Sequence, residues 1–361
     1  MKKSLFIMAL GAIALMSCSQ DEIIEVKQDA IAFSAFTENA SRADATTDAG
    51  TLTEFNVYAY VNEDGEKLYF NEVASKSDGI FKTTNTYYWP SAAVDFYCVY
   101  PSDKTLTNKG ISSYKCANFS PAYHNEDLLY SVSLDNTRTS GNVNSNGTAT
   151  INFRHALAMV EFKFEKSSVY GLDLTINSLT IKNIINQRSY ELPNKSTDPN
   201  FETATKEKEL AAADELPEDT RGTWSNMDGV SAADYFFSFT TGTLAVGLDI
   251  DAKDVAVGNN ISYFVMPQTL TAAEVVNTTW SNNYILIDCK IVKNNVTIKN
   301  GNVAIPISGE WKEGYKYTYT FKFGEGAGYE PGTDKPVVVP ITWDITVDAM
   351  QNTDAVDVPM V

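Results

Sequence analysis

The chain has few of the residues that carry most enzymatic chemistry. Its 361 residues include two histidines, His124 and His155, and neither belongs to a recognisable catalytic or metal-binding motif. The zinc-protease helix motif, the serine nucleophile elbow, the phosphate-binding glycine loop and the paired-cysteine motif are absent. His155 follows Ile151 and Phe153 on an alternating segment, so we expect a hydrogen-bonded structural histidine. The sequence therefore predicts no catalytic centre, no metal site and no cofactor.

Basic residues are also scarce relative to acidic ones. Lysine and arginine total 28 against 46 aspartates and glutamates, which gives a formal net charge of −18. An acidic chain of this kind repels nucleic acid and anionic lipid, so nucleic-acid binding is excluded as an expectation. With only 20 glycines and 12 prolines and 12% aromatic residues, the composition favours a packed core over disorder.

Long apolar runs are missing except at the N-terminus. Lys2 and Lys3 precede an apolar stretch from Leu5 to Met16, and the small residue Ser17 precedes Cys18. A basic start, a short apolar core and small residues at the cut site are typical of a secretory signal, here residues 1–17. The run Leu-Met-Ser-Cys resembles a bacterial lipobox, in which the cysteine thiol takes a diacylglyceryl group. We therefore expect lipidation of Cys18 to provide the membrane attachment.

The three remaining cysteines are Cys98, Cys116 and Cys289. Cys98 shares a strand face with Val94 and Phe96, and Cys289 also lies on an apolar face, so both are expected to be buried thiols. The oxidising cell envelope permits a disulfide between Cys98 and Cys116, and the sequence leaves that pairing open.

Apolar and polar residues alternate with a period of two through most of the chain. Residues 31–36 form an early example, and residues 315–323 place tyrosines and phenylalanines on one face with lysines and threonines on the other. A last apolar stripe runs over 337–347, and the only helical candidate is 195–218, which can equally be a loop insertion. Many short alternating segments predict an all-β protein built from antiparallel β-sandwiches.

Composition also suggests how the chain is divided. Residues 135–147 are polar and rich in turn-forming residues, and we interpret them as the boundary between two domains. The predicted organisation is a lipid-anchored tether over 18–30, an N-terminal β-sandwich over 31–140 and a C-terminal β-sandwich over 141–361. Near His155 the alternation changes phase, which predicts a β-bulge.

Two further groups of residues have a functional and a structural interpretation. The acidic run from Asp249 to Asp254 lacks the glycine and terminal glutamate of a calcium loop, so a solvated turn is favoured. Several aromatic residues can build a sugar-binding platform, but core packing explains them more simply. They are Tyr87, Tyr88, Trp89, Trp224 and Trp280.

Several segments together resemble one bacterial protein family. They are Tyr87-Tyr88-Trp89-Pro90, Val94 to Pro101, Asp127-Leu128-Leu129-Tyr130, Ile151 to Ala158, Tyr263 to Gln268 and Trp311 to Tyr317. Their order and spacing over nearly the whole mature chain resemble the fimbrillin-like (Mfa-like) lipoproteins of Bacteroidota, the subunits of type V pili. The acidic Ser19 to Glu22 after Cys18 also resembles the signal that directs lipoproteins of that phylum to the outer surface.

The resemblance implies two tandem transthyretin-like β-sandwich domains and a structural or adhesive role in a surface fimbrium. In polymerising members of the family, an arginine-specific protease cuts beyond the first strand, and a neighbour's strand fills the groove. The matching position here is Arg42, followed by Ala43, and an ordinary exposed loop arginine is the equally weighted alternative. The expected partners are other fimbrial subunits, either copies of this chain or related ones, outer-membrane lipid through Cys18, and a ligand on a host or bacterial surface.

Strand exchange also has a physical basis in the sequence. A sandwich that lacks one strand exposes an apolar groove and unpaired backbone, which an alternating strand from another chain can complete. The donor candidate is the C-terminal stripe, although in the free monomer the favoured interpretation is the last strand of its own domain. Its apolar residues are Val337, Val339, Ile341, Trp343, Ile345 and Val347.

Two alternative functions remain open at this stage. A surface glycan-binding lipoprotein for nutrient capture predicts an exposed row of aromatic residues beside polar groups. A hydrolase predicts a cleft with perturbed carboxylates or a histidine pair.

Overall fold

The structure is a computed structural model that describes residues 29–37, 52–63, 65–108, 114–121, 126–166, 171–193, 222–225, 233–238, 263–276, 279–324 and 341–349. Within these ranges the chain is all-β and contains no helix. Several features predicted from the sequence lie outside the described residues. They are Cys18, Arg42, Ala43, Val337, Val339, the acidic run 249–254 and the helical candidate 195–218. No helix in the described part is long and apolar enough to cross a membrane.

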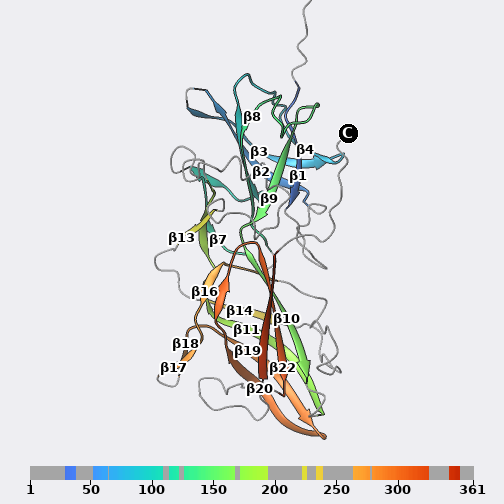
Figure 1. The fold of residues 1–361 in the computed structure, drawn as a ribbon, viewed down its shortest axis with the longest axis vertical. Helices are drawn as coiled ribbons and strands as arrows, with labels where there is room; N and C mark the ends of the chain where they lie inside the picture. Colours follow the sequence, from blue (N-terminus) through green and yellow to red (C-terminus); the bar gives the residue numbers. More distant parts are fainter. Residues whose placement is uncertain are drawn as a thin grey trace, which may run out of the picture.

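The N-terminal part is a seven-stranded sheet that closes on itself. In sheet order the strands are β1 (Ala32–Thr37), β4 (Ile80–Thr83), β3 (Glu66–Ser77), β2 (Glu54–Asn62), β5 (Val94–Tyr100), β8 (Leu129–Asn136) and β9 (Thr148–His155). Closure is made by β1, which lies between β4 and β9 (Figure 1). The sheet surrounds an apolar core that includes Phe33, Phe55, Phe96 and Phe153, all fully buried.

The C-terminal part is a β-sandwich, at the opposite end of the molecule from the closed sheet (Figure 1). One sheet has the order β15 (Tyr263–Val265), β10 (Ala158–Lys166), β22 (Tyr315–Phe323) and β23 (Ile341–Ala349). The other has the order β14 (Ala233–Ser238), β11 (Leu172–Ile184), β19 (Tyr284–Lys293) and β20 (Val296–Pro306). The two inner faces share one buried core, as the predicted alternation requires. Tyr317, Tyr319, Phe321 and Phe323 on β22 all point into it.

A third, smaller sheet joins the two halves of the sequence. Its order is β13 (Thr223–Ser225), β12 (Arg188–Glu191), β7 (Tyr114–Phe119) and β6 (Leu106–Asn108). It contributes to a separate apolar core, with Tyr97 from the closed sheet and Met159 and Phe264 from the C-terminal sandwich. Two short ladders complete the described fold: β16 (Gln268–Leu270) with β21 (Gly309–Trp311), and β17 (Glu274–Val276) with β18 (Thr279–Ser281).

The structure changes two expectations about organisation. The phase change near His155 is not a β-bulge, because the chain leaves the closed sheet after β9 and enters the C-terminal sheet at β10. The turn-rich stretch 135–147 is followed by β9, which still belongs to the N-terminal sheet. We therefore propose to move the domain boundary from residue 140 to residues 156–157, where the sheet changes.

The cysteines are buried thiols. Cys98, Cys116 and Cys289 are all free, so no disulfide links Cys98 to Cys116. Each lies in a different apolar core: Cys98 in the closed sheet, Cys116 in the joining core and Cys289 in the C-terminal sandwich. Cys98 and Cys116 therefore belong to separate clusters, which explains why they do not pair.

Candidate functional site: the first strand and its groove

Strand β1 closes the N-terminal sheet by pairing on both of its edges. It runs parallel to β9 over six register pairs, from Ala32 opposite Thr148 to Thr37 opposite Phe153. On the other edge it meets β4 antiparallel, at Phe33 opposite Phe81. A central strand of this kind satisfies backbone groups on two neighbours at once, so its removal would leave two unpaired edges.

Strand β9 depends on β1 for most of its pairing. Its other sheet neighbour, β8, contacts it only at Leu129 opposite His155 and Tyr130 opposite Arg154. Among the described residues, the remaining β9 pairing outside β1 is a single bridge between Val143 and Ala149. Loss of β1 would therefore expose a long run of β9 backbone that another extended segment can pair with.

The inward side chains of β1, together with Ile31 just before it, fill the core behind the strand. Ile31 and Phe33 are buried, and the Phe33 ring lies edge-on to Phe55 at 5.9 Å and to Phe96 at 5.2 Å between centroids. Burying an aromatic or branched side chain of this size contributes about 1.5–3 kcal/mol. Ala35 is half-buried and packs against the same core. The groove under β1 thus accepts a branched residue, an aromatic residue and a small residue at alternate positions.

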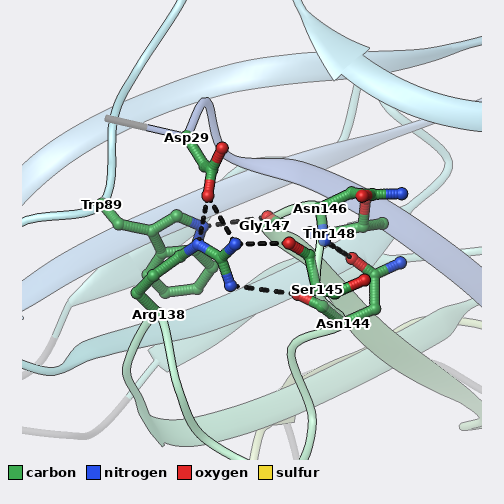
Figure 2. A network of polar contacts seen from close by, with 8 residues as sticks. All are labelled: Asp29, Trp89, Arg138, Asn144, Ser145, Asn146, Gly147 and Thr148. Atoms are coloured by element: carbon green, nitrogen blue, oxygen red, sulfur yellow. Dashed lines mark hydrogen bonds and ion pairs between the residues drawn. The ribbon is translucent and has the colours of Figure 1, made fainter. Parts of the chain in front are cut away.

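A polar network holds the chain just before β1 (Figure 2). The Arg138 guanidinium donates Nε–H to Asp29 Oδ2 at 2.7 Å, and its Nη2 donates a shorter bond to the same oxygen. Nη1 donates to the Asn144 carbonyl at 3.1 Å, and Nη2 also donates to the Ser145 carbonyl at 2.5 Å. The Arg138 and Asp29 side chains are 31% and 39% exposed, so the pair lies at the surface of the closed sheet.

The loop that supports Arg138 is shaped by its own hydrogen bonds. Asn144 Oδ1 accepts from the backbone N–H groups of Asn146 and Thr148, which closes the turn before β9. Gly147 has φ +80°, and a Cβ at this position would lie 2.9 Å from Asp29 Cβ. Glycine is therefore required both for the left-handed backbone and for the close approach of the chain at Asp29.

A second segment, residues 85–89, holds the other side of the same stretch. The Tyr87 carbonyl accepts from Ile31 N–H at 2.7 Å, the Asp29 carbonyl accepts from Trp89 N–H at 3.3 Å, and Trp89 Nε1 donates to the Gly147 carbonyl at 2.9 Å. Glu72 on β3 fixes this segment by accepting from the Tyr87 hydroxyl at 2.7 Å. That hydrogen bond, together with burial, raises the pKa of Tyr87.

The sequence did not predict the Asp29–Arg138 pair. Asp29 belonged to the expected tether and Arg138 to the expected linker, and the two are 109 positions apart in the chain. An ion pair between residues so distant in sequence leaves no local pattern. The turn-forming residues from Asn142 to Gly147 do form a folded turn before β9.

The predicted donor stripe is partly visible. Its residues Ile341, Trp343, Ile345 and Val347 lie in β23, which pairs antiparallel with β22 of the same chain from Tyr315–Ala349 to Phe323–Ile341. Ile345 is half-buried and packs against the C-terminal core. Among the described strands β23 has one neighbour only, so it forms the edge of its sheet.

The aromatic residues considered for a sugar platform mostly pack inside the protein, as the favoured interpretation expects. Trp89 is buried in the N-terminal core, Trp224 packs against Tyr190 with tilted rings beside the joining core, and Trp280 is buried against Tyr284. Trp224 lines an open cavity of about 390 Å³ together with Arg188. Its Nε1 is already bonded to the Ala156 carbonyl, and Arg188 Nη1 donates to the Pro267 carbonyl. Tyr87 and Trp224 are half-buried, and Tyr88 is the single exposed member of the five, so these residues form no exposed row for a glycan.

His155 is a buried structural histidine, as expected. Its Nδ1 lies 2.5 Å from Asp127 Oδ2, and both side chains are almost fully buried where the chain passes from β9 to β10. No group of three metal-ligating side chains occurs in the described ranges. His124 lies outside those ranges.

The sequence matches a known protein family. A family model described as fimbrillin-like matches residues 41–343. The chain belongs to the fimbrillin-like family. No curated protein is significantly similar to it.

Solved structures with the same fold have low sequence identity. A fimbrial protein from Bacteroides vulgatus is 14% identical, with a TM-score of 0.57 over 89% of this chain and 99% of that one. A candidate cell adhesion protein from Bacteroides ovatus is 10% identical, with a TM-score of 0.50 over 91% of this chain and 99% of that one. At these identities the likeness concerns the fold of this fimbrillin-like chain.

Proposed function

We propose that this fimbrillin-like chain is a structural or adhesive subunit of type V surface fimbriae, and that it assembles by strand exchange. Family membership supports the fimbrial role, as does the fold that the chain shares with a fimbrial protein and a candidate cell adhesion protein. A structural role of this kind involves no catalysis. The observation that carries the exchange mechanism is the position of β1, the strand that closes the N-terminal sheet and supplies most of the β9 pairing.

The proposed sequence of events begins at the N-terminus. Signal removal and lipidation at Cys18 place the protein on the outer membrane, facing outward, and multiple acyl chains give stable anchoring. Cys18→Ala should leave the protein unprocessed or released, and a fully processed variant that stays in the membrane fraction would contradict this step. Cleavage between Arg42 and Ala43 then cuts the covalent link that follows β1.

After the cut, β1 is held in its groove by non-covalent contacts only. A neighbouring subunit can then compete for the groove with its own alternating strand, for which the 337–347 stripe is the proposed donor. Backbone pairing supplies affinity, and alternate side-chain pockets supply register. Partners are other fimbrial subunits, either copies of this chain or related ones.

Limited digestion tests the mechanism. A soluble chain that begins after Cys18 is treated with an arginine-specific protease and analysed by sizing and electron microscopy. Ladders or fibres should form with the wild type and not with Arg42→Ala. The chain has five arginines, of which Arg138, Arg154 and Arg188 lie within the fold. Arg221→Ala is therefore the matched control for Arg42→Ala, and it should assemble like the wild type. Complete cleavage at Arg42 that yields only monomers with β1 still bound would contradict polymerisation and favour a tip, anchor or non-polymerising role.

A further inference from the structure

Arg138 and the turn at 144–147 form a cradle at the end of the groove where β1 begins (Figure 2). The guanidinium is held by the carbonyls of Asn144 and Ser145, so its position does not depend on Asp29 alone. Two of its nitrogens donate to one carboxylate oxygen of Asp29. A planar guanidinium fixed in this way recognises a carboxylate with strong, directional hydrogen bonds.

The cradle has a fixed relation to the apolar pockets. Asp29 lies two residues before Ile31 and four before Phe33, and both of these side chains are buried in the core. Strand β1 runs parallel to β9 and begins with Ala32 opposite Thr148. The Asp29 carboxylate therefore lies at the end of the groove next to Thr148. A one-residue slip would turn the apolar residues outward and also move the carboxylate away from Arg138.

We propose that Arg138 is a carboxylate-binding site that sets the register and direction of whichever strand occupies the groove. This inference rests on the proposed strand exchange and names the chemistry of its partner. The preferred occupant is an extended segment with an aspartate or glutamate two residues before its first buried apolar residue and four before a large second one.

The donor stripe of this chain does not meet that requirement. The six apolar residues that define the stripe occupy the odd positions from Val337 to Val347, and Val338 is not one of them, whereas the nearby acids Asp334, Asp344 and Asp348 have even numbers. In a strand, odd and even residues face opposite sides, so no register places both the apolar stripe in the core and an acid on the cradle. The position two residues before Val337 is Lys335, which Arg138 repels. The site therefore favours β1 over the 337–347 strand and opposes strand exchange between copies of this chain.

Peptide exchange on the cut protein tests the proposal. The chain that begins after Cys18 is cut at a site-specific protease sequence placed within residues 38–51. Fluorescent peptides that copy residues 27–37, with Asp29 or with Asn at that position, are then followed by anisotropy. The Asp29 peptide should bind about five to ten times more tightly, the range for a charged hydrogen bond at a partly exposed site. Equal affinities on the wild-type protein would overturn the proposal.

Two protein variants show whether Arg138 is the cause. Arg138→Gln should bring the affinities of the two peptides together, whereas Lys82→Gln should preserve the difference. Lys82 is the matched control because it is an exposed cation on β4, next to β1. Its substitution by Gln removes one positive charge, as Arg138→Gln does. A difference that persists in Arg138→Gln would overturn the assignment. A peptide that copies residues 335–347 should bind more weakly than the Asp29 peptide to the wild type, and its binding should not fall when Arg138 is removed.

A second measurement separates this proposal from strand exchange itself. If neither 27–37 peptide enters the cut protein, strand exchange fails, and the uncut protein still tests the cradle. Hydrogen exchange at the Ile31 amide, which donates to the Tyr87 carbonyl, is compared in Asp29→Asn, Arg138→Gln and the double variant. The double variant should open no more readily than either single one, because both remove the same contact. Fully additive effects would overturn the proposal.

Discussion

Strands β1 and β23, the first and last that the structure describes, are held in opposite ways. Strand β1 has a neighbour on each edge and places Phe33 against two other phenylalanines of a closed core. Strand β23 pairs over nine residues with β22 alone, at the edge of its sheet. Removal of an edge strand uncovers one neighbour, whereas removal of β1 opens a closed sheet and its core. The comparison therefore supports the proposed role of the β1 groove as the acceptor, and it makes β23 the strand that should leave its sheet more easily.

The largest difference between the two strands should appear on deletion of one side chain from each. Phe33→Ala removes a fully buried ring at the centre of the N-terminal core and should lower the free energy of unfolding by about 3–5 kcal/mol. Ile345→Ala removes a half-buried side chain at the sandwich edge and should cost about 1–2 kcal/mol. Urea unfolding of the two variants measures both values. Equal losses would mean that β1 is no more deeply built into the fold than β23.

The sequence predicted the faces of individual strands better than their neighbours. Alternation over 315–323 correctly placed Tyr317, Tyr319 and Phe321 in the core, because burial of one sheet face is recorded in every second residue. The first strand was also correctly located, with bounds that differ by one residue. These are local properties, and the residues that determine them are adjacent in the chain.

Pairing between distant segments was not predictable in the same way. The joining sheet combines β6 and β7 with β12 and β13, and three-residue strands such as β13 are too short to show a period. The Asp29–Arg138 pair depends on this kind of long-range geometry, since its members come from segments that composition assigned to a tether and a linker. Charged residues in polar stretches give the same local signal whether they are solvated or paired.

The three free thiols distinguish the two ends of the molecule, because each lies in a different core. Burial raises the pKa of Cys98 well above its ordinary value, and it raises the pKa of Cys116 to about 11 and of Cys289 to about 12. Thiolate is the reactive form, so at pH 8 all three should react with iodoacetamide only when their surroundings open.

Cleavage after Arg42 and removal of the β1 peptide should affect these thiols unequally. Cys98 lies in the core that β1 covers and should react about 100-fold faster, which corresponds to roughly 2.7 kcal/mol of lost protection. Cys289 lies in the C-terminal core and should keep its original rate. Mass spectrometry of labelled peptides, on a chain that begins after Cys18, measures both. A parallel rise at Cys289 would show that the two halves open together and that β1 has no local role.

The smallest of the expected effects concerns the turn that positions Arg138. A Cβ on Gly147 would lie 2.9 Å from Asp29 Cβ, 3.1 Å from the Ala30 carbonyl oxygen and 3.2 Å from Trp89 Nε1, on a backbone with φ +80°. Gly147→Ala should therefore lower stability by about 1–2 kcal/mol, with contributions from the left-handed conformation and from displacement of Asp29. Gly141→Ala is the matched control, because it lies in the same turn-rich stretch and its Cβ would meet nothing within 4 Å. Its effect should stay within about 0.5 kcal/mol. Hydrogen exchange at the Ile31 amide locates the loss, since a strain confined to the loop would leave that amide protected. Protection that is unchanged in Gly147→Ala would show that the turn and the start of β1 are not mechanically linked.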